Sequence, residues 1–281
     1  MHALPTLVAL AAALLLTPPI LRHLREEGFT RENYRGRALP FPGGIAIVAA
    51  GVLALGVCGA LAKLASADVF DFGVPLVFDY AIGVALLGLI DDVLSGASRG
   101  WRGHGRAVLG GGFSTGALKA VGSLALALYV VPGWSLSAGR YLLGVALVVL
   151  TTNLFNLLDL RPGRSVKAFA LLGAGLAIFA WRGIADTIPL WAVGPFAAPA
   201  LVLGVYDLRE RTMLGDTGAN LVGGIAGIWM VLALDTTGQA VALAIVLALT
   251  VYGEFRSLNS LIERTPLLRQ IDSIGRNDAH A

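Results

Sequence analysis

The side chains best suited to chemistry are acids and amides that end two apolar runs of the sequence. Asp91 and Asp92 end one run. Successive helical residues point about 100° apart, so one carboxylate can enter a pocket while the other orients a neighbour. Asn153, Asn156 and Asp159 end another run at intervals of three, which makes a slanting polar stripe about 9 Å long on a helix. Their oxygens can bind a hard cation, or phosphate and sugar hydroxyl groups.

Two further clusters begin apolar runs. Asp216 lies in the segment Leu214-Gly215-Asp216-Thr217-Gly218. A helix N-terminus there would offer an anion site, and the glycines would let a ligand approach the backbone. An acid in that place suits Mg²⁺ bridging a diphosphate. Lys119 falls in the first turn of its run, where a cation opposes the helix dipole unless an anion is held nearby.

The elements that must position these side chains are membrane-spanning helices. Of the 281 residues, 56% are hydrophobic and 14% are charged, with a mean hydropathy of +0.76, whereas ordinary globular chains carry roughly 25% charged residues. A span needs about 20 residues to cross the hydrocarbon layer. Nine segments qualify: 3–21, 43–65, 76–90, 116–131, 140–158, 166–182, 189–205, 217–234 and 239–255. We expect an all-α bundle that forms one membrane domain over residues 1–281.

The basic residues predict the orientation. With the N-terminus outside, the inner segments and their edges contain 18 of the 21 Lys and Arg residues, and only Lys63, Arg140 and Arg182 lie outside. This agrees with the positive-inside rule and explains the basic residues without nucleic acid. Arg22 and Arg25 follow the first run and no basic residue precedes it, so we expect a retained span rather than a signal peptide. The C-terminus is expected in the cytoplasm, and a single cysteine excludes an intramolecular disulfide.

All four polar clusters fall at inner helix ends in this topology, although each has a structural alternative. The aspartate pair can simply end a span, Asn can hydrogen-bond between helices, Asp216 can cap its helix, and Lys119 can extend to the lipid headgroups. Ionisable residues in spans are costly and point to function. Acids for a divalent cation and a lysine for phosphate favour phosphoryl transfer, in which the protein positions groups and neutralises charge.

The same clusters belong to a longer series of motifs. In chain order these are Asn33-Tyr34-Arg35-Gly36-Arg37 with Pro42-Gly43-Gly44, Gly88-Leu89-Ile90-Asp91-Asp92, Gly100-Trp101-Arg102-Gly103-His104, Thr115-Gly116-Ala117-Leu118-Lys119, Asn153-Leu154-Phe155-Asn156-Leu157-Leu158-Asp159 and Leu214-Gly215-Asp216-Thr217-Gly218. In kind and order they resemble the polyprenyl-phosphate N-acetylhexosamine-1-phosphate transferases, over roughly residues 33–220.

The resemblance implies a Mg²⁺-dependent enzyme of the cell membrane that acts on its cytoplasmic face. It would transfer a sugar-1-phosphate from a UDP-sugar to a polyprenyl phosphate, releasing UMP, for synthesis of a cell-envelope polymer. Carried over to this chain, Asp216 and Asn156 would contact the metal, and Lys119 and Asn153 would bind substrate. Asp91 or Asp92 would assist the attacking lipid phosphate, and Asp159 would support catalysis. The resemblance allows a homodimer.

The chain departs from the family pattern in two places. A Gly-x-Asp-Gly segment usually follows the amide motif, but here Leu160-Arg161-Pro162-Gly163-Arg164 follows it. A histidine-rich segment is also missing from the last inner loop, which argues against a muramoyl-pentapeptide substrate. We expect Arg161 and Arg164 to bind donor phosphate oxygens, as paired guanidinium groups do.

Two other readings stay open. A relative without transferase activity would bind lipid phosphate as a scaffold, or would partner an envelope protein. A transporter is the weaker reading, because transport sites lie near the midplane of the bilayer, whereas these acids are expected at helix ends.

Overall fold

A computed structural model describes residues 2–70, 73–94, 114–131, 137–183 and 188–276 of the chain. Its longer helices are α1 (Leu4–Glu26), α2 (Ile45–Leu64), α3 (Val74–Leu94), α5 (Thr115–Val130), α6 (Ala138–Leu158), α7 (Arg164–Trp181), α8 (Ile188–Leu208), α9 (Gly215–Ala233) and α10 (Thr236–Phe255). Within these ranges, eight helices are long and apolar enough to cross a membrane, and α5 is apolar but has 16 residues. The predicted all-α, multi-span membrane fold is confirmed at this level, while the count of nine spans and their orientation stay predictions.

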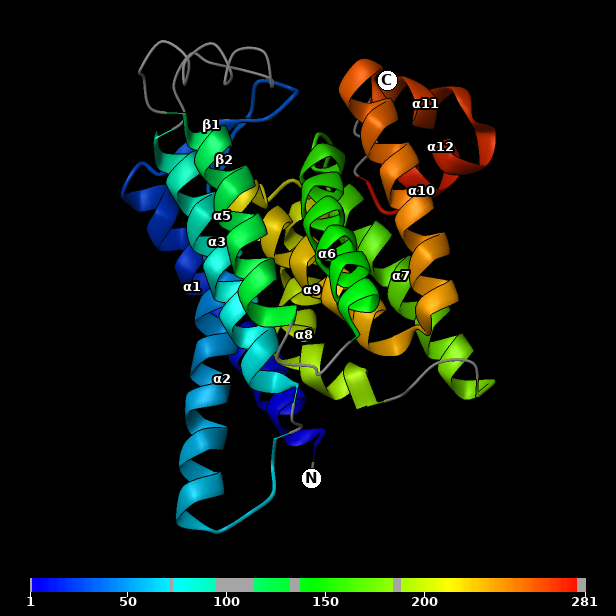
Figure 1. Ribbon diagram of the computed structural model, residues 1–281. Helices are drawn as coiled ribbons and strands as arrows, with labels where there is room; N and C mark the ends of the chain where they lie inside the picture. Colours follow the sequence, from blue (N-terminus) through cyan, green and yellow to red (C-terminus); the bar gives the residue numbers. More distant parts are fainter. Residues whose placement is uncertain (1, 71–72, 95–113, 132–136, 184–187, 277–281) are drawn as a thin grey trace.

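Helix α9 forms the centre of the bundle (Figure 1), and nearly all of its residues are buried. It packs against α3, α6, α7 and α8. The contact with α6 is close because small residues face it: a Cβ atom added at Gly227 would lie 2.8 Å from the Cα of Val148. Small residues of this kind let membrane helices approach backbone to backbone. Helix α9 is therefore held on several sides, so its first turn is a firm base for a site.

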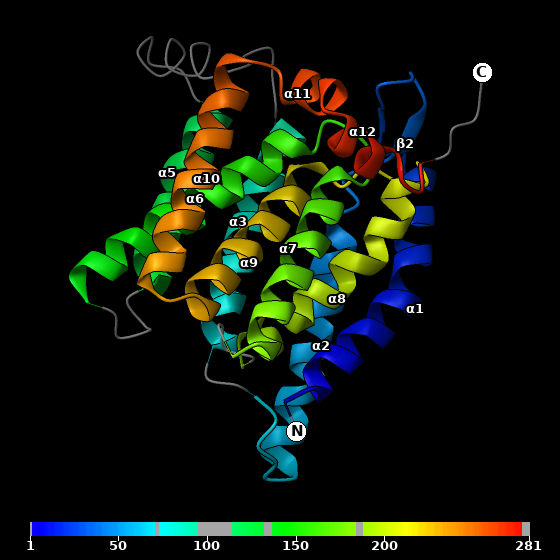
Figure 2. The same cartoon turned by 90° about the vertical axis from the view of Figure 1, so that its right-hand side faces the viewer.

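Shorter elements gather at one end of the bundle, opposite the N-terminus (Figures 1 and 2). They are the antiparallel hairpin of β1 (Thr30–Glu32) and β2 (Ala38–Pro40), and the helices α11 (Leu258–Arg264) and α12 (Pro266–Ser273). None of them was predicted, because the hairpin is three residues per strand and α11 and α12 are a turn or two long. At this same end α3 and α6 finish, and α5 and α9 begin. The four polar clusters are thus brought together by the alternating directions of the helices.

Candidate functional site

The site is built around the first turn of α9, which Asp92 of α3 caps. One carboxylate oxygen of Asp92 accepts a hydrogen bond from the Asp216 backbone N–H at 3.0 Å. The other accepts from the backbone N–H and the hydroxyl of Thr217, at 2.9 and 2.7 Å. A helix N-terminus leaves such N–H groups unpaired unless a side chain reaches them. Asp92 supplies that cap from a neighbouring helix, and both of its oxygens are engaged.

Two glycines permit this contact. Gly215, which begins α9, has a φ of +73°, and a conformation of that kind favours glycine. Gly88 lies one turn before Asp92 on α3, where a Cβ atom would come within 2.4 Å of the Asp216 backbone oxygen. The backbones of α3 and α9 therefore meet at van der Waals distance. This approach explains why the aspartate pair and the Gly-Asp-Thr-Gly segment both carry glycine.

Lys119 of α5 lies between the acids of two other helices. Its ammonium group is 3.1 Å from a carboxylate oxygen of Asp91 and 2.6 Å from one of Asp216. With its amide oriented to satisfy both neighbours, Asn156 of α6 accepts from Lys119 at 2.9 Å and donates to Asp216 at 2.8 Å. One cation thus joins two carboxylates and an amide from α3, α9 and α6. The structure brings together four of the residues that the sequence singled out.

A polar cavity of about 230 Å³ opens beside this cluster. Asp92, Asp159 and Asp216 line one part of it, and Arg31, Tyr34 and Arg161 line another. The guanidinium carbon of Arg161 lies 4.2 Å above the centre of the Tyr34 ring. The cavity therefore has an acidic wall next to Lys119 and a wall of arginine and tyrosine, which suits a ligand that carries both metal-bridged and free phosphate oxygens.

Asp159 follows the last residue of α6 and lines the cavity. Burial raises the pKa of Asp159 well above its ordinary value, and the negative charges of Asp207, Asp216 and Asp92 raise it further. Carboxylates that lie close together disfavour one another's charged form. Asp159 is accordingly the acid of this group best suited to hold a proton.

The loop that follows Asp159 separates its two arginines. Arg161 faces the cavity, with a hydrogen bond of 3.4 Å to Asn259. Arg164 begins α7, is only 5% exposed, and forms two parallel hydrogen bonds of 3.0 and 2.9 Å with Asp272 of α12. Arg161 thus lines the cavity, and its predicted contact with substrate stays a prediction, whereas the guanidinium of Arg164 is occupied by a carboxylate.

Two acids that the sequence argument passed over support the site. Asp207, near the end of α8, accepts a hydrogen bond of 2.7 Å from the backbone N–H of Gly163 and lines the cavity. The buried side chain of Glu210 accepts from Asn33 at 3.0 Å and lies 3.4 Å from Arg35, which holds the hairpin. Asp91 and Asp159 were recognised as acids at the inner end of a span. Asp207 has the same position, so the same signal could have identified it.

Two of the motif positions contribute less to this geometry. Asn153 is half-buried on α6, one turn before Asn156, and does not line the cavity. The segment Gly100-Trp101-Arg102-Gly103-His104 lies outside the described residues.

The donor set fits Mg²⁺ bound together with a substrate. The described residues hold no ready-made group of three His, Cys, Asp or Glu side chains for a metal. Mg²⁺ is commonly held by one or two carboxylates plus phosphate and water oxygens, however. Lys119 shows that a positive charge already lies against oxygens of Asp91 and Asp216. The acids would be free for a metal once a phosphate drew Lys119 away.

Comparison with known proteins adds no assignment. No protein-family model matches the chain, and no curated protein matches its sequence.

Proposed function

We propose that the protein transfers a sugar-1-phosphate from a UDP-sugar to a polyprenyl phosphate at this end of the bundle, with release of UMP. The observation that carries the proposal is the convergence of Asp91, Lys119, Asn156 and Asp216 from four helices beside a polar cavity. Metal-binding oxygens next to a phosphate-binding cation are what phosphoryl transfer needs. The resemblance in motif order supplies the substrate class.

In the proposed reaction an oxygen of the lipid phosphate attacks the phosphorus that bears the sugar. A new P–O bond forms, the P–O bond to UMP breaks, and the products are UMP and a lipid-linked diphosphosugar. Mg²⁺ would neutralise charge on the diphosphate, held through Asp216 and Asn156. Lys119 would bind diphosphate oxygens. One-step transfer and transfer through an enzyme-linked intermediate are both compatible with these residues.

The two adjacent aspartates take different roles in this scheme. Asp91 has one oxygen hydrogen-bonded to the ammonium group of Lys119, the group that would bind the diphosphate, so it is the one placed to accept a proton from the attacking phosphate. Asp92 is bound on both oxygens by α9, so it acts as a positioning residue. Arg161 would contact the donor from the opposite wall.

The experiment is a screen of UDP-sugars with polyprenyl phosphate and Mg²⁺, in which purified protein releases UMP. Asp216→Asn and Asp91→Asn should each lower turnover at least about hundredfold, since charge-stabilising groups in active sites contribute on that scale. Asp79→Asn is the matched control, because Asp79 lies on α3 away from the cluster and is exposed. Wild-type protein that releases no UMP with any donor would overturn the proposal.

A scaffold that binds lipid phosphate without transfer is the second candidate. It is favoured by the loop after Asp159, where Arg164 is committed to Asp272 rather than to the cavity. This candidate predicts lipid-phosphate binding that survives Asp216→Asn and is never accompanied by UMP release. Turnover that requires both Mg²⁺ and Asp216 would exclude it.

A further inference from the structure

Two adjoining clefts lie between α1 and α8, away from the acidic site. One has a volume of about 250 Å³ and is lined by Leu14, Val202, Val205, Tyr206, Arg209 and Arg211. The other, of about 440 Å³, is lined by Pro18, Leu21, Arg22, Arg25, Pro40, Tyr206 and Arg211. Because Tyr206 and Arg211 border both, the two clefts form one depression, which we call the α1–α8 cleft.

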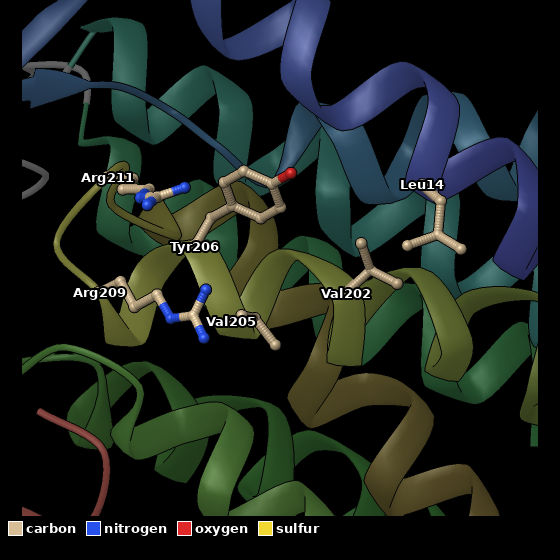
Figure 3. A pocket seen from close by; sticks show the side chains of 6 residues that line it. All are labelled: Leu14, Val202, Val205, Tyr206, Arg209 and Arg211. Carbon is tan, nitrogen blue, oxygen red and sulfur yellow. The ribbon is translucent and has the colours of Figure 1, made fainter.

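The chemistry of the α1–α8 cleft changes along its length. Figure 3 shows the guanidinium groups of Arg209 and Arg211 at one end, Leu14 and Val202 toward the other, and Tyr206 between them. Arg209 and Arg211 follow the last residue of α8, whereas Leu14 lies near the middle of α1. Leu14 is 59% exposed, so the apolar part opens toward the space that the bilayer fills. Cations at the end of the bundle and aliphatic side chains along its flank match the layout of a phospholipid.

Four arginines gather around the α1–α8 cleft. Arg35 and Arg37 pair with Glu210, and Arg164 and Arg276 pair with Asp272. Within the described part of the chain, eight arginine side chains have neither a hydrogen bond nor an ion pair, and four of them border this one depression: Arg22, Arg25, Arg209 and Arg211. No acid lines the cleft. Four unpaired cations around one depression that holds no acid favour an anion from outside the chain.

We propose that the α1–α8 cleft binds one anionic phospholipid of the surrounding membrane, distinct from the substrates of the acidic site. Its phosphate would lie among Arg22, Arg25 and Arg211, because guanidinium groups bind phosphate oxygens in pairs. An acyl chain would lie over Leu14 and Val202. Clusters of arginine beside membrane helices attract anionic lipids in general, and here a shaped depression adds a place for one molecule.

The bound lipid would also stabilise the connection between α8 and α9, which leads to the acidic site. Pro40, in the wall of the cleft, accepts hydrogen bonds from the hydroxyl of Thr212 at 2.9 Å and from the backbone N–H of Met213 at 3.2 Å. These bonds tie the hairpin to the connection between α8 and α9. Asp216 follows three residues after Met213, so a lipid that steadies Arg211 and Pro40 steadies the approach to α9.

The test measures lipid retained by the purified full chain, by native mass spectrometry, after exchange into vesicles of phosphatidylglycerol or of phosphatidylcholine. We expect one phosphatidylglycerol per chain and little phosphatidylcholine. Arg22→Gln with Arg211→Gln should weaken phosphatidylglycerol binding roughly tenfold or more, by the usual contribution of a juxtamembrane arginine. Both side chains are exposed and unpaired, so this variant should unfold at the wild-type temperature.

The control variant carries Arg256→Gln with Arg269→Gln, which removes the same charge at the same end of the bundle. Both of these side chains are also exposed, and lipid binding should change less than twofold. Equal loss in the two variants, equal retention of the two lipids, or full retention in the cleft variant would each overturn the proposal. Displacement of phosphatidylglycerol by one equivalent of polyprenyl phosphate would assign the cleft to the acceptor lipid instead. Displacement by millimolar inorganic phosphate would show that the cleft binds a free anion rather than a lipid. UMP release is not part of the readout, so the outcome is separate from that of the transferase assay.

Discussion

At the scale of single residues, the position of Lys119 explains how so many acids can share one end of the bundle. Its ammonium group contacts Asp91, Asp216 and Asn156. Charges buried without a partner are destabilising, whereas paired and hydrogen-bonded ones are tolerated. Without Lys119, the carboxylates of Asp91 and Asp216 would face each other with no counter-ion. The lysine therefore has a structural role, and in the proposed reaction it would turn to phosphate when a metal ion took its place.

The different surroundings of Asp91 and Asp92 give a test of their roles. Asp92→Ala removes the cap from two N–H groups of α9, so we expect a loss of about 0.5–2 kcal/mol in the free energy of unfolding, measured by thermal unfolding in detergent. Asp92→Asn keeps one acceptor and should lose less. Asp91→Asn leaves the pair of Lys119 with Asp216 intact, and it should unfold close to wild type while losing turnover. If Asp91→Asn unfolds as early as Asp92→Ala, this division of roles is wrong.

The sequence predicted which polar residues gather but not how they divide the work. Asp91 and Asp92 were recognised by type and position, and helical geometry already implied that they point in different directions. Which of them caps α9 depends on the close approach at Gly88, a tertiary contact that periodicity cannot reveal. The pairing of Arg164 with Asp272 is also a tertiary contact, because Asp272 lies 108 residues later in the chain. The sequence therefore offered no partner for Arg164 other than phosphate. Charge at a helix end is visible in the sequence, but its partner is not.

At the scale of elements, the helices α11 and α12 are held at the start of α7 by hydrogen bonds. Arg164 bonds Asp272 and Asn259, and the ammonium group of Lys167 donates to the backbone oxygen of Ile271 at 3.3 Å. A cation at the C-terminal end of α12 also complements the dipole of that helix. Long spans could be predicted from hydropathy alone, because some 20 apolar residues in a row are unmistakable. Helices of seven or eight residues depend on such contacts, so the sequence did not reveal them.

The ion pair between Arg164 and Asp272 should make the docking of α12 sensitive to acid. Burial alone would raise the pKa of Asp272, but hydrogen bonds from Arg164 and the charges of Arg164 and Arg276 outweigh it and lower that pKa. A lowered pKa stabilises the docked state above the ordinary value, near 4, and this stabilisation is lost as pH falls through the lowered value. After correction for the intrinsic effect of pH, exchange of the backbone amide hydrogens of α12 should thus stay slow from pH 8 to pH 5. It should become faster only in stronger acid.

Asp272→Asn should give fast exchange in α12 at every pH, once rates are corrected for the intrinsic effect of pH. The control is Glu263→Gln, since Glu263 lies 3.9 Å from Arg161 and is largely exposed, where ion pairs contribute little. Exchange in α12 that accelerates already between pH 8 and pH 6, or that is unchanged in Asp272→Asn, would contradict a docking role for this carboxylate.

At the scale of the whole molecule, function depends on which side of the membrane the acidic site faces. The hairpin, α11, α12 and the four polar clusters share one end of the bundle (Figures 1 and 2). The distribution of Lys and Arg predicts that this end faces the cytoplasm, where nucleotide sugars are made. The α1–α8 cleft, whose arginines lie at the same end, would then meet the anionic inner leaflet. Both proposals therefore require the same orientation of the protein in the membrane.

That orientation can be tested with single cysteines, because the natural Cys58 is buried in α2 and is the only cysteine of the chain. In a Cys58→Ser background, Thr236→Cys marks the start of α10 and Ser273→Cys marks the end of α12, and both positions are exposed. A membrane-impermeant maleimide should label Thr236→Cys in intact cells and Ser273→Cys only after permeabilisation. The two positions flank α10, so a correct insertion must give opposite results for them. The reverse pattern would place Asp91, Lys119 and Asp216 outside the cell, away from any UDP-sugar, and would refute the transferase proposal whatever the geometry of the site.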